Sequence, residues 1–203
     1  MSRLPVVRGD RGQTLPLYIW LTSILLFAGL AFFAWAQAAS VRNQAQTAAD
    51  AAALAAAQET RDELIDGLEA ALAGDGDWLD WLDPQQATGS GATAAAQELA
   101  AENDATLQGG AEPVVQNGFL GYRVAVRTNF TAGESVIPGT ESASGEASAT
   151  AVLQPRCQVD ADAQESEMVE LDCEGGLVTL DPNDFDPADL PDAAVLFSVY
   201  LAD

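Results

Sequence analysis

The sequence predicts an α+β protein in which one N-terminal transmembrane helix continues into a long helix, followed by a small extracytoplasmic α+β domain with one disulfide. Three observations support this prediction. No charged residue occurs between Arg11 and Arg42, so a helix there can cross a membrane. The residues that follow are mostly strong helix formers, many of them alanine. Beyond about residue 120, apolar and polar residues alternate, which is typical of half-buried strands.

These features divide the 203 residues into five regions. We expect a cytoplasmic basic stub (1–11), a transmembrane helix (12–40) and an alanine-rich extramembrane helix (41–74). A region with tryptophans, a linker and a second helix (75–110) follows, and an acidic, strand-rich outer domain (111–203) completes the chain.

Composition excludes several classes of function. The chain has eight basic and 31 acidic residues and no histidine, for a formal net charge of -23. Nucleic acid is therefore excluded as a partner, because phosphate backbones are bound by clustered Lys and Arg. Without imidazole there is no Ser-His or Cys-His nucleophile and no His-ligated zinc. Two cysteines are too few for a four-thiolate metal site.

The charge is distributed unevenly on the two sides of the apolar segment. Arg3, Arg8 and Arg11 with Asp10 make the first eleven residues net +2, and the remainder is net -25. Residues 15–39 are long enough to cross the roughly 30 Å hydrocarbon core at about 1.5 Å per residue. Basic residues favour the cytoplasmic side. We therefore expect Arg3, Arg8 and Arg11 to set the orientation, with the N-terminus in the cytoplasm.

A cleavable signal peptide is the alternative interpretation of this segment, because residues 34–38 contain small residues at suitable spacing for cleavage. Two features favour a membrane anchor. The apolar run is longer than the roughly 7 to 15 residues of a usual signal peptide. The helical pattern also continues to Leu72 with no proline and only Gly67 as a glycine after residue 40.

Alanines recur at every fourth residue beyond the membrane segment, at Ala45, Ala49, Ala53 and Ala57. A face of methyl groups allows another backbone to approach closely, and we expect this face, with Asp50 beside it, to pack against helices of other proteins. The alternative is that these alanines serve helix propensity alone and that Asp50 is a solvated helix residue.

The rest of the chain contains signals for one further helix and several strands. A short amphipathic segment with tryptophans (78–83) precedes a flexible connector (85–91), and residues 92–107 are expected to form the second helix. Four strands are predicted where apolar residues alternate or cluster. They cover residues 122–130, 146–153, 177–180 and 193–201.

Cys157 and Cys173 are the only cysteines, and both lie in the outer domain. Outside the cytoplasm a disulfide between them is the natural interpretation. In the chain-entropy model it would contribute roughly 3 kcal/mol of stability. Two free buried thiols are the alternative.

The many carboxylates do not define a site for catalysis or for a metal. Residues 181–192 resemble a calcium-binding loop, but Asp186 stands where an EF-hand needs glycine and Asp192 where it needs glutamate. A pair of carboxylates for glycoside hydrolysis would need a cleft that the sequence does not reveal. We therefore expect no cofactor, no metal, no small-molecule substrate and no enzymatic activity.

The N-terminal third resembles a known family. Arg11-Gly12-Gln13 opens the apolar helix, and residues 41–57 read VRNQAQTAADAAALAAA. This pattern is similar to that of the TadE/TadG-like family of Tad (Flp) pilus-assembly proteins, over about residues 11–57. The resemblance implies a pilin-like layout, a role as minor pseudopilin or assembly factor, and pilins or other pilus-assembly proteins as partners in the membrane. It implies no enzymatic activity.

Some members of the family are cut after a glycine by a prepilin peptidase, with a glutamate at the fifth position of the mature chain. Gly12 and Gln13 fit the first requirement, but the fifth residue after Gly12 is Leu17. We expect the chain to remain uncleaved. The alternative function is that of a single-pass, membrane-anchored surface protein whose outer domain binds a ligand.

Overall fold

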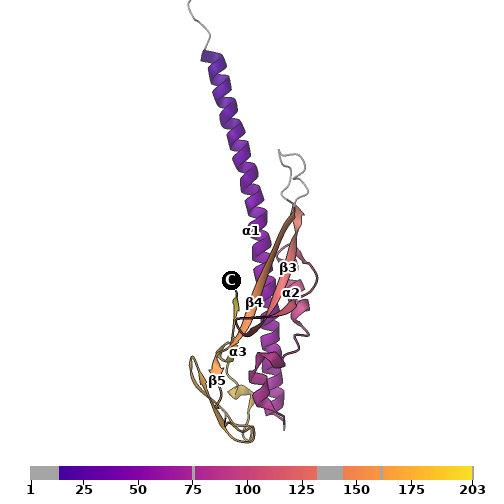
Figure 1. Cartoon of the computed structure of the whole chain (residues 1–203), viewed down its shortest axis with the longest axis vertical. Coiled ribbons are helices and arrows are strands. Elements are labelled where there is room, and N and C mark those ends of the chain that lie inside the picture. Colours follow the sequence, from indigo (N-terminus) through magenta and orange to yellow (C-terminus); the bar gives the residue numbers. More distant parts are fainter. Residues whose placement is uncertain (1–13, 75, 132–143, 161, 203) are drawn as a thin grey trace, which may run out of the picture.

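The computed structural model describes residues 14–74, 76–131, 144–160 and 162–202. Helix α1 (Thr14–Leu72) continues through 59 residues, or about 88 Å at about 1.5 Å per residue. Residues 14–40 of α1, its free half, project away from the rest of the protein (Figure 1). The remaining described residues form an α+β head around residues 41–72, its packed half. Arg3, Arg8, Arg11, Gly12 and Gln13 lie outside the described residues.

Short helices follow α1. These are η1 (Trp78–Leu82), η2 (Pro84–Gln86) and α2 (Ala92–Glu102). The expectation that α2 would reach residue 107 was wrong. The Asn103 side chain donates to the Leu99 carbonyl at 2.8 Å, and Asp104 has a φ of 52°, which ends the helix. The chain then pairs with the sheet as β1 (Ala105–Leu107).

The main sheet is antiparallel and covers the packed half of α1. Its order is β1-β3-β4-β8, and β2 pairs with β3 beside β1. The strands are β2 (Glu112–Gln116), β3 (Phe119–Thr131), β4 (Ser144–Pro155) and β8 (Phe197–Leu201). The strands predicted at 122–130 and 146–153 are therefore present and longer than expected.

A two-residue turn joins β2 to β3. Gln116 pairs with Phe119, and the residues between them, Asn117 and Gly118, have φ of 54° and 87°. Asn-Gly favours this tight hairpin turn because both residues accept positive φ. β2 was not among the strands expected from the sequence, although the Asn117-Gly118 dipeptide indicates a hairpin between two strands.

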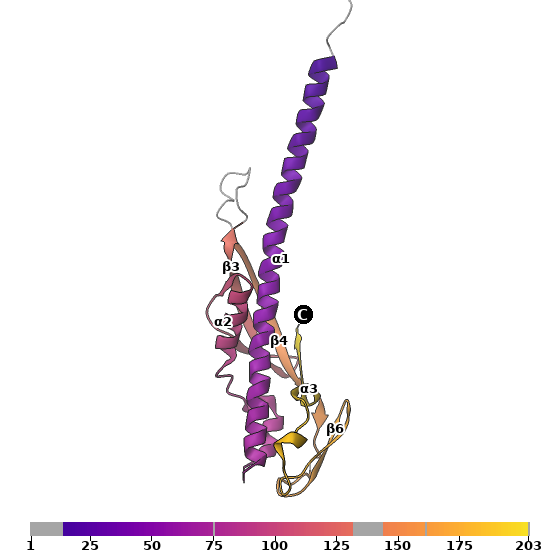
Figure 2. The same cartoon turned by 180° about the vertical axis from the view of Figure 1, so that it is seen from behind.

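A second, smaller sheet lies at the end of the head away from the free half of α1 (Figure 2). It contains β5 (Cys157–Gln158), β6 (Val169–Cys173) and β7 (Gly176–Leu180) in that order. Short helices η3 (Pro187–Asp189) and α3 (Ala193–Leu196) lead into β8. The prediction of one strand over 193–201 was wrong in its first half, because the Asp192 carboxylate accepts from the Ala194 amide at 2.8 Å and caps α3.

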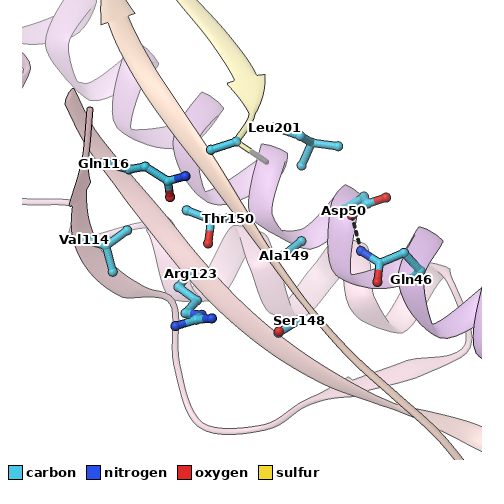
Figure 3. Close-up of a pocket in the computed structure, with 10 residues that line it drawn as sticks. Gln46, Asp50, Val114, Gln116, Arg123, Ser148, Ala149, Thr150 and Leu201 are labelled. Carbon is cyan, nitrogen blue, oxygen red and sulfur yellow. Dashed lines mark hydrogen bonds between the residues drawn. The ribbon is translucent and has the colours of Figure 1, made fainter. Parts of the chain in front are cut away.

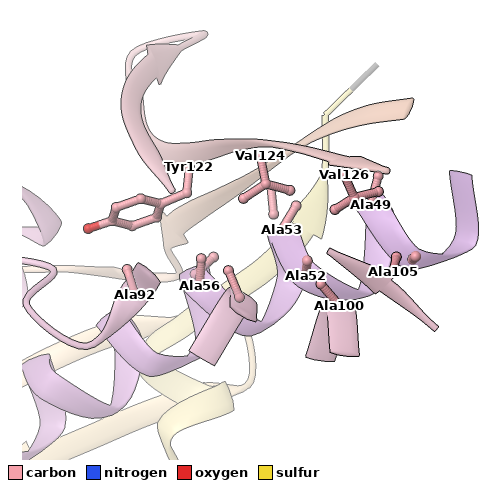
Figure 4. Packing of buried hydrophobic residues seen from close by; sticks show 14 residues of the cluster. Ala49, Ala52, Ala53, Ala56, Ala92, Ala100, Ala105, Tyr122, Val124 and Val126 are labelled. Carbon is pink, nitrogen blue, oxygen red and sulfur yellow. The ribbon is translucent and has the colours of Figure 1, made fainter. Parts of the chain in front are cut away.

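Two hydrophobic clusters follow one another along α1. The first is built mainly of alanines from α1 and α2, with Tyr122, Val124 and Val126 from β3 above them (Figure 4). The second has larger side chains, among them Leu64, Leu68 and the buried Trp78. The packed half of α1 is therefore the shared core element of the head.

Candidate functional site

The free half of α1 exposes a large apolar surface, whose contact with water is energetically unfavourable. Its large side chains are between 43% and 75% exposed, and none of its most apolar window is buried. Exposed apolar areas of this extent mark contact with a membrane or another protein. The helix is long and apolar enough to cross a bilayer. The side chains are Leu15, Leu17, Tyr18, Ile19, Trp20, Leu21, Ile24, Leu25, Leu26, Phe27, Leu30, Phe32, Phe33 and Trp35.

The hydroxyl groups of Thr22 and Ser23 in this segment donate to carbonyl oxygens of the same helix. The Thr22 hydroxyl donates to the Tyr18 carbonyl at 2.9 Å, and the Ser23 hydroxyl donates to the Ile19 carbonyl at 2.7 Å. Hydroxyl groups bonded in this way can enter hydrocarbon without leaving a donor unpaired. These two hydroxyl groups are thus compatible with a lipid environment.

The alanine face of α1 is closed within the protein. We call this face the alanine seam, and each of its residues is 0% exposed: Ala45, Ala48, Ala49, Ala52, Ala53, Ala56 and Ala57. The expectation that Ala45, Ala49, Ala53 and Ala57 contact helices of other proteins is corrected by this burial. Helix periodicity shows that a face is suited to close packing but does not show which partner covers it.

Small residues on the partner elements explain why the seam closes on its own chain. Ala92, Ala96 and Ala100 of α2 are buried in the same cluster. On β4, Gly145 faces α1, and a Cβ at this position would lie 2.8 Å from the Val41 carbonyl oxygen. At the interface of α1 with α2, alanine methyl groups face one another, and at the interface of α1 with β4, Gly145 has no side chain. Both interfaces therefore allow the backbones to approach closely.

Asp50 differs from the seam because it is only half buried and lies at the rim of a groove. The Gln46 side chain donates to its carboxylate at 2.8 Å. The groove has a volume of about 620 Å³ and lies around β4, close to the end of β8 (Figure 3). Gln46 and Asp50 form its α1 side, Ser148, Ala149 and Thr150 come from β4, and Val114, Gln116, Arg123, Leu201 and Ala202 complete it.

The groove carries one charge of each sign. Asp50 lies on the α1 side, and Arg123 lies on the face of the sheet that points away from α1. Neither makes an ion pair with another described residue, whereas Arg127 pairs with Glu146 nearby. Sequence reasoning selected Asp50 but missed Gln46, Arg123 and Gly145. The four-residue spacing of Gln46 and Asp50 on a helix was the available signal for their contact.

The disulfide predicted between Cys157 and Cys173 is present. The two residues are direct neighbours across β5 and β6, and the disulfide closes the small sheet at its edge. Cys173 is 5% exposed and belongs to the second hydrophobic cluster. The disulfide thus links β5 to β6 within the small sheet, and the packing of the second cluster holds this sheet against α1.

Carboxylates in the head serve local hydrogen bonding. Burial raises the pKa of the Glu63 carboxyl, but hydrogen bonds from the Thr88 hydroxyl and from the Thr88 and Gly89 amides outweigh it and lower this pKa overall. The pKa of Glu165 is raised by desolvation, by a hydrogen bond with Asp77 and by the negative charges of Asp77 and Asp80.

The Asp181 carboxylate accepts a hydrogen bond from the Asn183 amide at 2.9 Å, as is common in turns. Across residues 14–74, 76–131, 144–160 and 162–202, no group of three or more acids and cysteines could hold a metal ion.

The fold and the exposed surface define a class of protein. In this class, the first half of a long helix is apolar enough to span a membrane, and its second half is the core of an elongated α+β head. Residues 12–59 match the family model described as "Putative Flp pilus-assembly TadE/G-like". The N-terminal segment of this chain is thus similar to the TadE/G-like family, over nearly the same residues as the sequence resemblance predicted. Comparisons with curated proteins and with solved structures gave no match.

The matched segment covers two structurally different parts of α1. It contains the apolar free half of α1 and the whole alanine seam, and it ends at Glu59, before the leucines of the second cluster begin at Leu64. The family segment is thus the part of α1 that joins a membrane-type helix to a head. The match indicates involvement in Tad pilus assembly and association with the membrane.

Proposed function

We propose that this protein is a membrane-anchored, pseudopilin-like component of Tad (Flp) pilus assembly that acts through protein contacts. The observation that carries the proposal is the coincidence of the family match over residues 12–59 with a helix that is exposed and apolar in one half and buried in the head in the other. A helix of this kind can anchor the head at a fixed height above a bilayer.

The orientation belongs to the same proposal. Arg3, Arg8 and Arg11 precede the apolar helix and favour a cytoplasmic N-terminus. The disulfide between Cys157 and Cys173 supports an oxidising, extracytoplasmic environment for the head. The two arguments are independent, since one concerns charge before the helix and the other thiol chemistry after it, and they agree.

The proposed activity is non-enzymatic. The chain contains no histidine, and its two cysteines form a disulfide. Desolvation and the neighbouring Asp77 and Asp80 carboxylates account for the raised pKa of Glu165, so this shift does not call for a catalytic role. Contacts with pilins or other assembly proteins in and above the membrane are the function that the anchor and the head support.

Deletion of the gene, followed by complementation, tests the proposal. We expect loss of surface pili, scored by electron microscopy, and recovery with the complete chain but not with residues 41–203 alone. Maleimide labelling of single cysteines at Ser2 and Thr179, in a background with Cys157→Ser and Cys173→Ser, tests the orientation. Labelling of intact cells at position 179 but not at position 2 is expected, and unchanged piliation after deletion would refute the proposed role.

A membrane-anchored surface protein with a ligand-binding head is the second candidate, and the groove beside Asp50 is the observation that favours it. Deletion separates the two candidates, because a surface receptor would leave pili intact. Loss of pili without any effect of groove substitutions would favour the assembly role over ligand binding.

A further inference from the structure

Strand β4 is only partly covered on the side away from β3. It pairs with β3 from Ser144 to Val152, but β8 pairs with it only from Ala151 to Pro155. The last contact along β8 is the Ala202 amide donating to the Thr150 carbonyl at 2.9 Å. Among the residues that the structure describes, no strand pairs with residues 144–149 on this side, which we call the open edge.

Strand geometry identifies the backbone groups that the open edge presents. Successive residues of a strand direct their N–H and C=O groups to opposite sides. Because Thr150 bonds toward β8, Ser148 and Glu146 direct theirs the same way, beyond the end of β8. Ala147 and Ala149 direct theirs toward β3, where they pair with Val126 and Val124. The backbone N–H and C=O groups of Ser148 and Glu146 therefore have no strand partner among the residues that the structure describes.

The groove beside Asp50 continues the path of β8 along this edge. In Figure 3, β8 ends at Leu201 next to β4, and the space beyond it lies over Gln46 and Asp50 of α1. Leu201, which faces α1 from the end of β8, is still 38% exposed. An added strand would lie on α1 in the same way as β8 does, with the groove volume of about 620 Å³ to receive its side chains.

A second copy of this chain does not suit the open edge. β4 runs alongside α1 (Figures 1 and 2), so antiparallel pairing of two open edges about a two-fold axis would reverse one α1 relative to the other. The two free halves would then point in opposite directions and could not enter one membrane. The same edge remains accessible to an extended segment that has no membrane helix of its own attached at that point.

We propose that the open edge of β4 binds an extended segment of a basic partner protein by strand addition. The segment runs antiparallel to β4, as β8 does, and its backbone pairs with Ser148 and Glu146. A Lys or Arg side chain on its α1-facing side meets Asp50, which has no cation among the described residues. The net charge of -23 favours approach of a basic partner. This inference rests on the proposed function for the existence of such a partner.

A peptide titration of the complete protein in detergent micelles tests the binding mode. The probes are the acetylated, amidated pentapeptide TVKVT and its counterpart TVEVT, which reverses the central charge. We expect TVKVT to slow amide hydrogen exchange at Ser148 and Glu146, measured by NMR, and TVEVT to have little effect. Equal protection by both peptides, or protection confined to other residues, would overturn the proposal.

Proline at the open edge provides the matched variants. Ser148→Pro removes an amide that faces away from β3, a position where proline is tolerated at a sheet edge. It should keep the fold and abolish the protection at Glu146, while Ser148→Ala should behave as the wild type. Glu146→Pro removes the next outward amide and serves if Ser148→Pro does not fold. Ala147→Pro removes an amide that pairs with β3 and should destabilise the head.

Asp50→Asn tests the contribution of the Asp50 negative charge to peptide binding, because it removes the charge and keeps the size of the side chain. We expect the affinity for TVKVT to fall roughly two- to fivefold, as for a partly exposed ion pair, and the preference over TVEVT to shrink by the same factor. An unchanged preference would overturn the assignment of Asp50. Protection of Ser148 that increases with protein concentration in the absence of peptide would assign the edge to a second copy instead.

Piliation distinguishes this inference from the proposed function. If deletion of the gene abolishes pili and Ser148→Pro also abolishes them while the protein accumulates normally, both stand. If deletion abolishes pili but Ser148→Pro and Glu146→Pro support them fully, strand addition fails and the assembly role remains. If deletion leaves pili unchanged, the proposed function fails, and the peptide titration alone then decides whether the edge binds a strand.

Discussion

Gly145 on β4 lies against the backbone of Val41 on α1: a Cβ added to Gly145 would lie 2.8 Å from the Val41 carbonyl oxygen and 3.0 Å from the Ala45 Cβ. Val41 is also the first residue along α1 that is buried. This contact therefore marks where the head begins. It places the end of the β3–β4 pair beside the point at which the free half of α1 ends, close to the expected membrane surface.

Gly145→Ala is expected to destabilise the head. The added methyl group would meet a helix backbone that cannot move aside as a flexible side chain can, so we expect a loss of about 1–3 kcal/mol in the free energy of unfolding. Urea unfolding in detergent, followed by tryptophan fluorescence, measures it. Gly175→Ala is the control, because a Cβ at Gly175 would have no atom within 4 Å. Equal stability of the two variants would contradict the close contact.

Ala53→Leu tests the alanine seam. Ala53 is 0% exposed, and three added carbon atoms have no space between α1 and its neighbours, so we expect overpacking of about 1–3 kcal/mol or more. Ala70→Leu, on an exposed position of the same helix, should change the unfolding free energy little. If Ala53→Leu is as stable as Ala70→Leu, the seam is not closed within the chain.

The long helix and the main strands were predictable because each carries a local signal. Uncharged and alanine-rich residues specify α1, and two-residue alternation specifies β3 from Tyr122 to Phe130. The boundary of α2 was not predictable from helix propensity alone. The turn at Asn103 and Asp104 is stabilised by side-chain hydrogen bonding and by the pairing of β1 with β3, which is a contact distant in sequence.

The candidate site was less predictable, because it depends on which surfaces meet. The spacing of Ala45, Ala49 and Ala53 indicates a tightly packed face, but only the fold shows that β4 and α2 cover it. Likewise, the open edge of β4 results from the different lengths of β4 and β8, and strand length is a tertiary property. Asp50 was identified from its position among alanines, whereas Arg123 reaches the same groove from a strand more than 70 residues later.

Charged residues in the free half of α1 should release the protein from the membrane. Arginine near the centre of a spanning helix costs about 3 kcal/mol for insertion, so we expect Leu26→Arg combined with Phe27→Arg to shift the protein to the soluble or aggregated fraction after carbonate extraction. Leu26→Ile combined with Phe27→Leu is the matched control and should remain in the membrane. Full membrane retention of the arginine variant would show that the free half is not the anchor.

Removal of the disulfide should loosen the small sheet more than the main sheet. Cys157→Ser together with Cys173→Ser is expected to lower the free energy of unfolding by roughly 2–5 kcal/mol. Hydrogen exchange should increase first in β6 and β7, since the second cluster holds them, and only later in β3 and β4. Exchange that increases equally in both sheets would show that the head unfolds as one cooperative unit.

Glu63 makes the stability of the head depend on pH in the acidic range. Hydrogen bonds from Thr88 and Gly89 overcome the effect of burial and lower the pKa of this carboxyl below 4.5. In the unfolded chain the carboxyl therefore binds its proton at higher pH than in the folded protein. Its contribution to stability is complete above about pH 4.5 and is lost as the pH falls through the lowered pKa.

Glu63→Gln is expected to lower the unfolding free energy by about 1 kcal/mol at pH 7 and to change it less at pH 3, because the wild-type carboxyl is then increasingly protonated in both states. Urea midpoints at several pH values between these limits measure the difference. Glu98→Gln, at an exposed position of α2, is the control and should run parallel to the wild type. A Glu63→Gln effect that is constant from pH 7 to pH 3 would show that the side chain stabilises the Thr88 turn through packing, and that its charge has no part in it.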